Sequence, residues 1–141
     1  LQHLKKSKNP HILNLSPPIS LKPKWFENFT AYTIAKFGMS MCVIGMSAEY
    51  KKYNIAVNAL WPKTAIDTAA IRMLGGVVRP EQCRKVDILA DASFFVLRRD
   101  SNKFTGKFYI DEDVLAEEGV TDLEKYSVKK GEKLFTDLYL D

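Results

Sequence analysis

Apolar residues along the chain form three short runs and one long segment with helical spacing. The runs at 11–15, 54–60 and 106–110 have the length of strands, and the last is entered through Thr105-Gly106. The run at 54–60 is apolar at both odd and even positions, as expected for a parallel strand buried on both faces. The segment 29–53 predicts the longest helix, with small or apolar residues at Ala35, Met39, Cys42, Val43 and Met46.

The remaining segments predict shorter elements and loops. Residues 1–9 have the pattern of a helix end, and the prolines and aromatic residues of 16–28 predict an ordered loop. A short helix is expected at 64–74, a break at 75–79, and one or two helices at 80–98 with Asp87 as a possible cap. Residues 114–141 are polar and weakly periodic. We therefore expect one domain at 1–113 and an extension or linker at 114–141.

Composition places the chain among soluble globular proteins and excludes several other classes. Its 141 residues are 46% hydrophobic and 27% charged, and the net charge of +4 comes from scattered lysines and arginines, which argues against nucleic-acid binding. Cys42 and Cys83 lack metal-ligand spacing, so no metal site is expected, and Cys42 is predicted to be a core residue. Free cysteines favour an intracellular setting. No apolar stretch is long enough to span a membrane.

Tyr32 and Lys36 are the first candidates for catalysis. Four residues separate them, so on a helix both side chains lie on one face with the ammonium near the phenol. A neighbouring cation stabilises a phenolate, which lets a tyrosine exchange a proton with an alcohol oxygen. The spacing alone also fits a solvated lysine beside a half-buried tyrosine, so the surrounding elements must decide.

Those elements follow the order strand, loop with Ser16, helix with Tyr32 and Lys36, and strand ending at Pro62. This order resembles the C-terminal half of the short-chain dehydrogenase/reductase family. The resemblance implies an α/β fold, namely the C-terminal part of a doubly wound, parallel-sheet, NAD(P)-binding Rossmann fold. It also implies that Tyr32 is the general acid/base and that Lys36 supports it while binding the nicotinamide ribose.

The family's third catalytic residue is a serine that holds the substrate oxygen, and here the chain departs from the pattern. The family serine usually stands thirteen residues before the tyrosine, whereas Ser16 stands sixteen before Tyr32 and is followed by proline. Ser20, twelve before Tyr32, is nearer by count. We favour Ser16 because it closes a strand, although both serines could simply satisfy turn amides.

The segment after the 54–60 strand is the candidate cofactor contact. The family usually has Pro-Gly and then a threonine, whereas this chain has Pro62-Lys63-Thr64-Ala65, followed by a second threonine, Thr68. The resemblance implies cofactor contacts at Tyr32, Lys36, Pro62, Thr64 and Ala65, with the threonine role open between Thr64 and Thr68. With lysine in place of glycine, a left-handed backbone at position 63 would cost more free energy. Lys63 could alternatively contact a cofactor phosphate or an acidic substrate.

The resemblance implies an NAD(P)-dependent oxidoreductase of lipid metabolism, with NADP or NAD as cofactor. The substrate would be a lipid-like, fatty or steroid carbonyl or secondary alcohol. Five residues could wall an apolar pocket for it, although such residues are more often core: Trp25, Phe26, Trp61, Ile66 and Met73. A homo-oligomer is expected, with small residues of the long helix at the subunit contact: Ala35, Gly38, Ser40 and Gly45. A peroxisomal or mitochondrial location rests on the resemblance alone.

No glycine-rich turn follows an early strand, although a dinucleotide-binding enzyme needs one to hold the pyrophosphate. We therefore expect a partial chain that is inactive and does not bind NAD(P) usefully by itself. An alternative is that the altered serine and Pro-Gly elements mark a catalytically weak module that binds a cofactor or a lipid.

Overall fold

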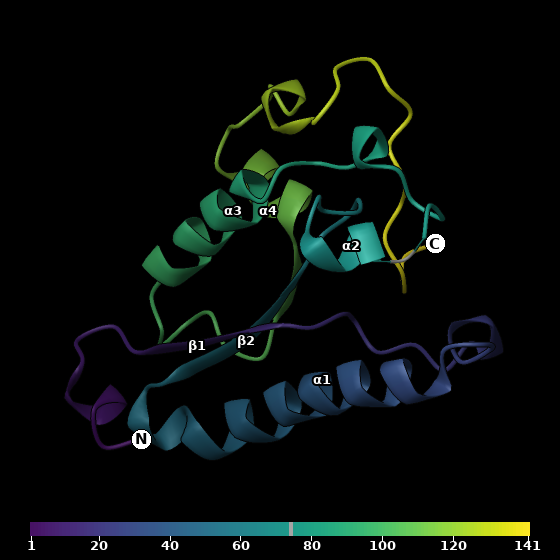
Figure 1. Cartoon of the computed structure of the whole chain (residues 1–141). Coiled ribbons are helices and arrows are strands. Elements are labelled where there is room, and N and C mark those ends of the chain that lie inside the picture. Colours follow the sequence, from purple (N-terminus) through teal and green to yellow (C-terminus); the bar gives the residue numbers. More distant parts are fainter. Residues whose placement is uncertain (74) are drawn as a thin grey trace. The chain divides into compact units, whose positions relative to one another are not determined.

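The computed structural model describes residues 1–73 and 75–141, which form two compact units (Figure 1). The first unit consists of Leu1–Trp61 and Val96–Tyr109, and the second of Pro62–Phe95 and Ile110–Asp141. Each unit thus combines two stretches that are distant in sequence.

A three-stranded sheet organises the first unit (Figure 1). Its strands are β1 (His11–Leu15), β2 (Ala56–Trp61) and β3 (Phe108–Ile110), in the order β1-β2-β3. β1 and β2 are parallel, with His11 opposite Ala56 and Leu15 opposite Leu60. On the other side of β2, the Ala59 N–H donates to the Lys107 carbonyl at 2.8 Å. The predicted parallel α/β fold is confirmed.

Two of these strands begin later than the sequence predicts. The expected start of the second strand, Asn54, has a left-handed backbone with φ of 58° and caps the 3-10 turn Lys51–Tyr53. Asparagine tolerates this conformation better than most residues, so the chain turns there before it extends at Ala56. Before β3, the Thr105 hydroxyl accepts the Val57 N–H, and Gly106 takes φ of 73°.

The long helix α1 (Thr30–Tyr50) lies along the strands of the first unit (Figure 1). Val43 packs with Val57 and Ala59 of β2 in a core that also includes half-buried Met46 and Tyr50. This contact buries the middle of β2, all six residues of which are buried.

The buried face of α1 differs from the predicted one. Its buried residues are Thr33, Phe37, Ser40 and Val43, a spacing of three to four residues. Three of the small or apolar positions on which the helix prediction rested are exposed: Ala35, Met39 and Cys42. Cys42 directly precedes buried Val43, and consecutive helical residues point about 100° apart, so only one of the two faces the sheet. The expectation that Cys42 lies in the core was wrong.

The second unit contains α2 (Ala69–Met73), α4 (Asp111–Glu117) and most of α3 (Asp87–Arg98), which begins at the predicted cap Asp87. Its core includes Ala65, Val78 and Cys83, with Phe135 packed against them. Of the predicted helix 64–74, residues 64–68 are not helical, and Leu74 lies outside the described residues.

The segment 114–141, expected to be an extension, packs within the second unit. Its buried residues are Val114, Leu115, Tyr126, Ser127 and Tyr139. Isolated bridges pair Thr64 with Thr136 and Arg84 with Ser127, so this segment adds backbone contacts as well as apolar side chains. The compact units therefore divide at positions other than 113/114. Within 1–73 and 75–141, none of the helices has the length and hydropathy needed to cross a bilayer.

Candidate active site

Lys36 is the centre of the candidate site in the first unit. Its Nζ donates a hydrogen bond of 3.2 Å to the carbonyl of Leu15, the last residue of β1. The same Nζ lies 5.9 Å from the ring centroid of Tyr32 and 5.2 Å from that of Trp61, the last residue of β2. The lysine thus connects the predicted acid/base tyrosine to the carboxyl ends of two parallel strands.

Two hydroxyl groups hold α1 against the loop that follows β1. The Ser40 Oγ donates to the Pro17 carbonyl at 2.6 Å, and the Thr33 Oγ1 donates to the Trp25 carbonyl. Both residues are fully buried, so these bonds fix the rotation of the helix about its axis. Tyr32 lies on the exposed side, with 46% of its surface accessible.

Ser16 and Ser20 have different surroundings. Ser16 directly follows Leu15, whose carbonyl accepts the Lys36 bond, and its buried Oγ has no hydrogen-bond partner among the described residues. The Ser20 Oγ instead accepts the N–H of Lys22 at 3.4 Å, as in a local serine turn. The structure therefore brings Ser16, and not Ser20, next to the Lys36 contact. Ser16 is enclosed, however, whereas Tyr32 is exposed.

The predicted cofactor segment Pro62-Lys63-Thr64-Ala65 belongs to the second unit, whereas Ser16, Tyr32 and Lys36 belong to the first. Much of its polar backbone is already engaged: the Lys63 N–H donates to Asp111 at 2.8 Å, and the Ala65 N–H to the Phe135 carbonyl at 2.9 Å. The Thr64 Oγ1 is buried without a partner among the described residues. The hydroxyl of Thr64 is thus a buried polar group of this segment that is available to a ligand.

Lys63 does not have the left-handed backbone considered for it from the sequence. Outside glycine, positive φ in the described residues occurs at Asn28, Asn54 and Tyr139, so Lys63 takes no left-handed backbone. Its exposed Nζ lies 3.8 Å from a carboxylate oxygen of Glu112. A lysine therefore fits here without the strain expected from replacing glycine.

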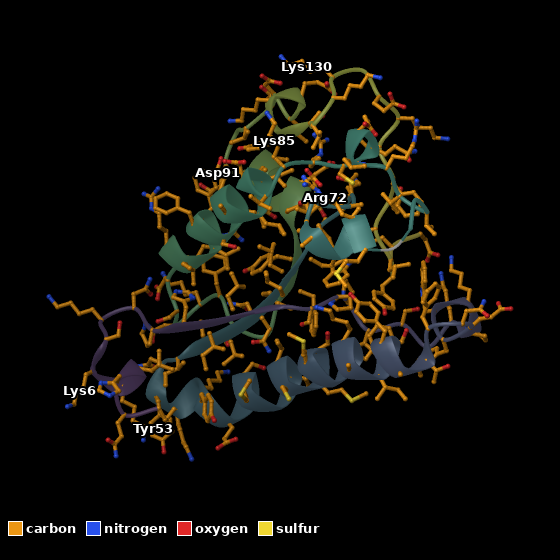
Figure 2. The ribbon with its side chains drawn as sticks, viewed as in Figure 1. Lys6, Tyr53, Arg72, Lys85, Asp91 and Lys130 are labelled. Carbon is orange, nitrogen blue, oxygen red and sulfur yellow. The ribbon has the colours of Figure 1, made fainter. Side chains whose placement is uncertain are left out.

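Thr68, the other candidate threonine, directly precedes α2, and its carbonyl accepts the Arg72 N–H at 3.3 Å. The neighbouring Asp67 forms two side-chain hydrogen bonds with Arg72, which Figure 2 shows on α2. The bond from this guanidinium lowers the pKa of Asp67 below its usual value. The pair closes the turn that leads from the cofactor segment into the helix.

A buried carboxylate, Asp111, was not among the residues singled out from the sequence. Its Oδ1 accepts the N–H groups of Lys63 and Glu112, both at 2.8 Å, while its buried Oδ2 has no partner among the described residues. Burial raises the pKa of Asp111 to about 6, against the opposing effect of these two donors. The sequence signal that could have identified Asp111 is the position of an acidic residue directly after the last predicted strand.

Arg84 completes this polar cluster. Its guanidinium contacts Glu112 at 2.8 and 3.0 Å and donates to the Leu123 carbonyl at 2.6 Å. Arg84 is only 6% exposed, so its charge is paired in a largely dry setting. Among the described residues, no group of three or more His, Cys, Asp or Glu could hold a metal ion.

The five predicted pocket residues are divided between the two units. Trp25, Phe26 and Trp61 belong to the first unit, where Phe26 packs edge-on against Phe37 with ring centroids 5.7 Å apart. In the second unit, Ile66 is buried, whereas Met73 is 85% exposed.

A cavity of about 140 Å³ in the first unit is lined by other residues: Lys51, Asn54, Ile55, Ser101, Asn102 and Thr105. These precede β2 and β3, so the cavity lies at the opposite ends of the strands from Lys36. It contains none of the candidate site residues.

Comparisons with known proteins bear on the family. No family model matches the chain. It is 59% identical to a protein of Danio rerio named hydroxysteroid dehydrogenase-like protein 2, over all of this chain and 34% of that protein. The structure of a dehydrogenase from Xanthomonas campestris is 48% identical with a TM-score of 0.94, over 99% of this chain and 51% of that one.

A short chain dehydrogenase from Mycobacterium thermoresistibile is 45% identical with a TM-score of 0.88, over 99% of this chain and 50% of that one. The chain spans about a third of the length of the curated relative and about half of each solved chain. The resemblance predicted from the sequence is confirmed.

Proposed function

We propose that this chain, which has the sequence relatives and the fold of short-chain dehydrogenases, supplies the acid/base half of an NAD(P)-dependent oxidoreductase site. The reaction would interconvert a carbonyl and a secondary alcohol. Tyr32 would exchange the proton, Lys36 would support it, and Ser16 would hold the substrate oxygen.

The position of the Lys36 ammonium is the observation that carries this proposal. It lies near the Tyr32 ring while bonded to the carbonyl that immediately precedes Ser16. The alternative interpretation, in which Lys36 is simply a solvated lysine on the helix surface, does not explain why its side chain is half-buried and directed at a strand end. Ser16 directly follows β1, and Tyr32 and Lys36 lie in the first two turns of α1.

In the reducing direction, the Tyr32 hydroxyl donates its proton to the carbonyl oxygen as that oxygen becomes an alcohol. The Lys36 ammonium stabilises the phenolate that remains. A hydrogen bond from the Ser16 Oγ polarises the same oxygen. The nicotinamide, when bound, supplies the hydride to the carbonyl carbon.

The residues present suit the nicotinamide end of such a cofactor. An ammonium has three N–H donors, and one of those of Lys36 goes to Leu15, which leaves donors for ribose hydroxyls. In the second unit, considered by itself, the Thr64 Oγ1 is a further proposed cofactor contact, because it is buried without a partner among the described residues. We propose NADP or NAD without a preference, because neither contact distinguishes the two.

Replacement of Tyr32 by phenylalanine tests the proposal in the natural full-length protein that contains this sequence. Tyr32→Phe should lower carbonyl reduction with NADPH or NADH at least about a hundredfold, the usual contribution of a general acid. Tyr53→Phe is the matched control, because the Tyr53 ring also lies near an ammonium, 3.5 Å from Lys5 Nζ, but follows the C-terminal end of α1, whereas Tyr32 lies near its start (Figure 2). Equal activity of Tyr32→Phe and wild type would refute the role of Tyr32.

The substrate and assembly are part of the same proposal. A fatty or steroid-like substrate and a peroxisomal or mitochondrial location rest on the resemblance alone. A homo-oligomer is supported by apolar side chains that α1 exposes: Ile34 is 62%, Met41 57% and Ile44 53% accessible. Ser40, expected at the subunit contact, is buried within its own unit.

A second candidate is a catalytically weak module that binds a cofactor or a lipid. The enclosure of Ser16 favours it, because a substrate oxygen cannot reach a buried Oγ unless the proline-containing loop moves. This function would be supported over the enzyme if Tyr32→Phe bound the cofactor with full affinity and if both wild type and variant showed the same minimal turnover.

A further inference from the structure

We propose that Asp111 is a positioning residue for the cofactor segment, because its carboxylate holds the backbone of Lys63 between Pro62 and Thr64. This inference rests on the proposed function and extends it to a residue that touches neither substrate nor the reacting atoms. All the residues involved belong to the second unit.

The Asp111 carboxylate links two pieces of chain that are distant in sequence. One oxygen accepts the Lys63 N–H and the Glu112 N–H, both at 2.8 Å, so the start of α4 and the cofactor segment share one acceptor. Asp111 is fully buried, and hydrogen bonds to a charged acceptor are roughly twice as strong as neutral ones. The segment cannot shift without breaking this contact.

Ion pairs of the adjacent Glu112 add a second attachment for Lys63. Glu112 lies next to it and pairs with Arg84 at 2.8 Å and with the Lys63 Nζ at 3.8 Å. Lys63 is thus held through its main chain by Asp111 and through its side chain by Glu112. Arg84 in turn bonds to the Leu123 carbonyl, which ties the cluster to the C-terminal part of the unit.

Thr64 is the residue that this anchoring would serve. Its Oγ1 is buried without a partner among the described residues, and it directly follows the anchored Lys63. The Ala65 N–H on its other side donates to the Phe135 carbonyl. With both neighbours fixed, the Thr64 hydroxyl is held in one place before a ligand arrives, which lowers the ordering cost of binding.

The test measures NADPH and NADH binding by calorimetry in the natural full-length protein. Asp111→Ala leaves two buried N–H groups unpaired and should weaken binding about tenfold, as expected for one lost buried contact. Asp111→Asn keeps an oxygen acceptor at the same place and should bind within about threefold of wild type. Asp113→Asn, an exposed acid of the same helical turn, is the matched control and should have no effect.

The outcomes separate this inference from the proposed function. Wild type that binds neither NADPH nor NADH refutes the proposed function and this inference with it. Two outcomes refute the positioning role alone, provided that the wild type binds the cofactor. Either Asp111→Ala binds with wild-type affinity, or Asp111→Asn binds as weakly as Asp111→Ala.

If Asp111→Ala does not fold, amide hydrogen exchange of Lys63 in Asp111→Asn decides. Slow exchange together with normal binding supports the anchor. Fast exchange with normal binding overturns it, because the contact would then be dispensable.

Discussion

The buried Asp111 carboxylate makes a specific prediction about stability and pH. Its pKa is about 6 in the folded protein, against 3.8 for an ordinary aspartate. The folded state therefore binds this proton more tightly than the unfolded state does. A difference of about 2 pKa units corresponds to about 3 kcal/mol of folding free energy.

The sign follows from which state prefers the proton. Well below pH 3.8 the group is protonated in both states and has no effect, whereas above its folded pKa the buried charge opposes folding in full. The contribution of Asp111 to stability thus falls as pH rises between these two values. Glu112 adds to this effect, while Arg84 and the two N–H donors reduce it.

Asp111→Asn removes the ionisation and keeps the acceptor. We expect the stability of the variant relative to wild type to rise by about 2 kcal/mol between about pH 4.5 and about pH 7.5. Burying the new amide N–H groups costs about 1–3 kcal/mol, which shifts the whole curve but not its slope. Urea unfolding of both proteins across this range measures the difference, with Asp113→Asn as the exposed control. A difference that does not change with pH would refute this account of Asp111.

Three further predictions concern other parts of the chain. Ser16→Ala should reduce turnover, whereas Ser20→Ala should leave it unchanged; the reverse result in a steady-state assay would assign the substrate contact to Ser20. Asn58→Leu should lower the free energy of unfolding by about 2–6 kcal/mol in a urea titration, because its buried amide bonds the Phe104 carbonyl and the Lys107 N–H and both would lose their partner. Ile44→Glu should shift a homo-oligomer toward monomer in sedimentation experiments; an unchanged assembly would show that this face of α1 is not the contact.

The sheet could be predicted from the sequence because its signals are local. Runs such as 11–15 and 54–60 have strand length and are separated by a proline-rich loop and a long helix, and the structure places β1 and β2 there. The strand ends were less predictable. Asn54 precedes an apolar run, as the first residue of a strand would, but its backbone is left-handed, which the sequence does not show. The proximity of Tyr32 and Lys36 could likewise be predicted, because helical spacing alone puts their side chains on one face.

The parts that the sequence missed depend on contacts between distant residues. Cys42 and Val43 look equally apolar, and only packing against β2 decides which one is buried. Asp111 was passed over because its partner, the Lys63 N–H, is 48 residues away and is a backbone group with no sequence signal. The segment 114–141 seemed polar because its buried side chains, among them Tyr126 and Tyr139, are widely spaced.

The interleaving of the two units limits how this protein can be divided experimentally. The chain passes from one unit to the other after Trp61, after Phe95 and after Tyr109. Any single cut therefore leaves residues of at least one unit on both products, and neither unit can be expressed as one uninterrupted piece. Separating α1 from the segment 62–65 would require a rearranged gene that joins 1–61 directly to 96–109.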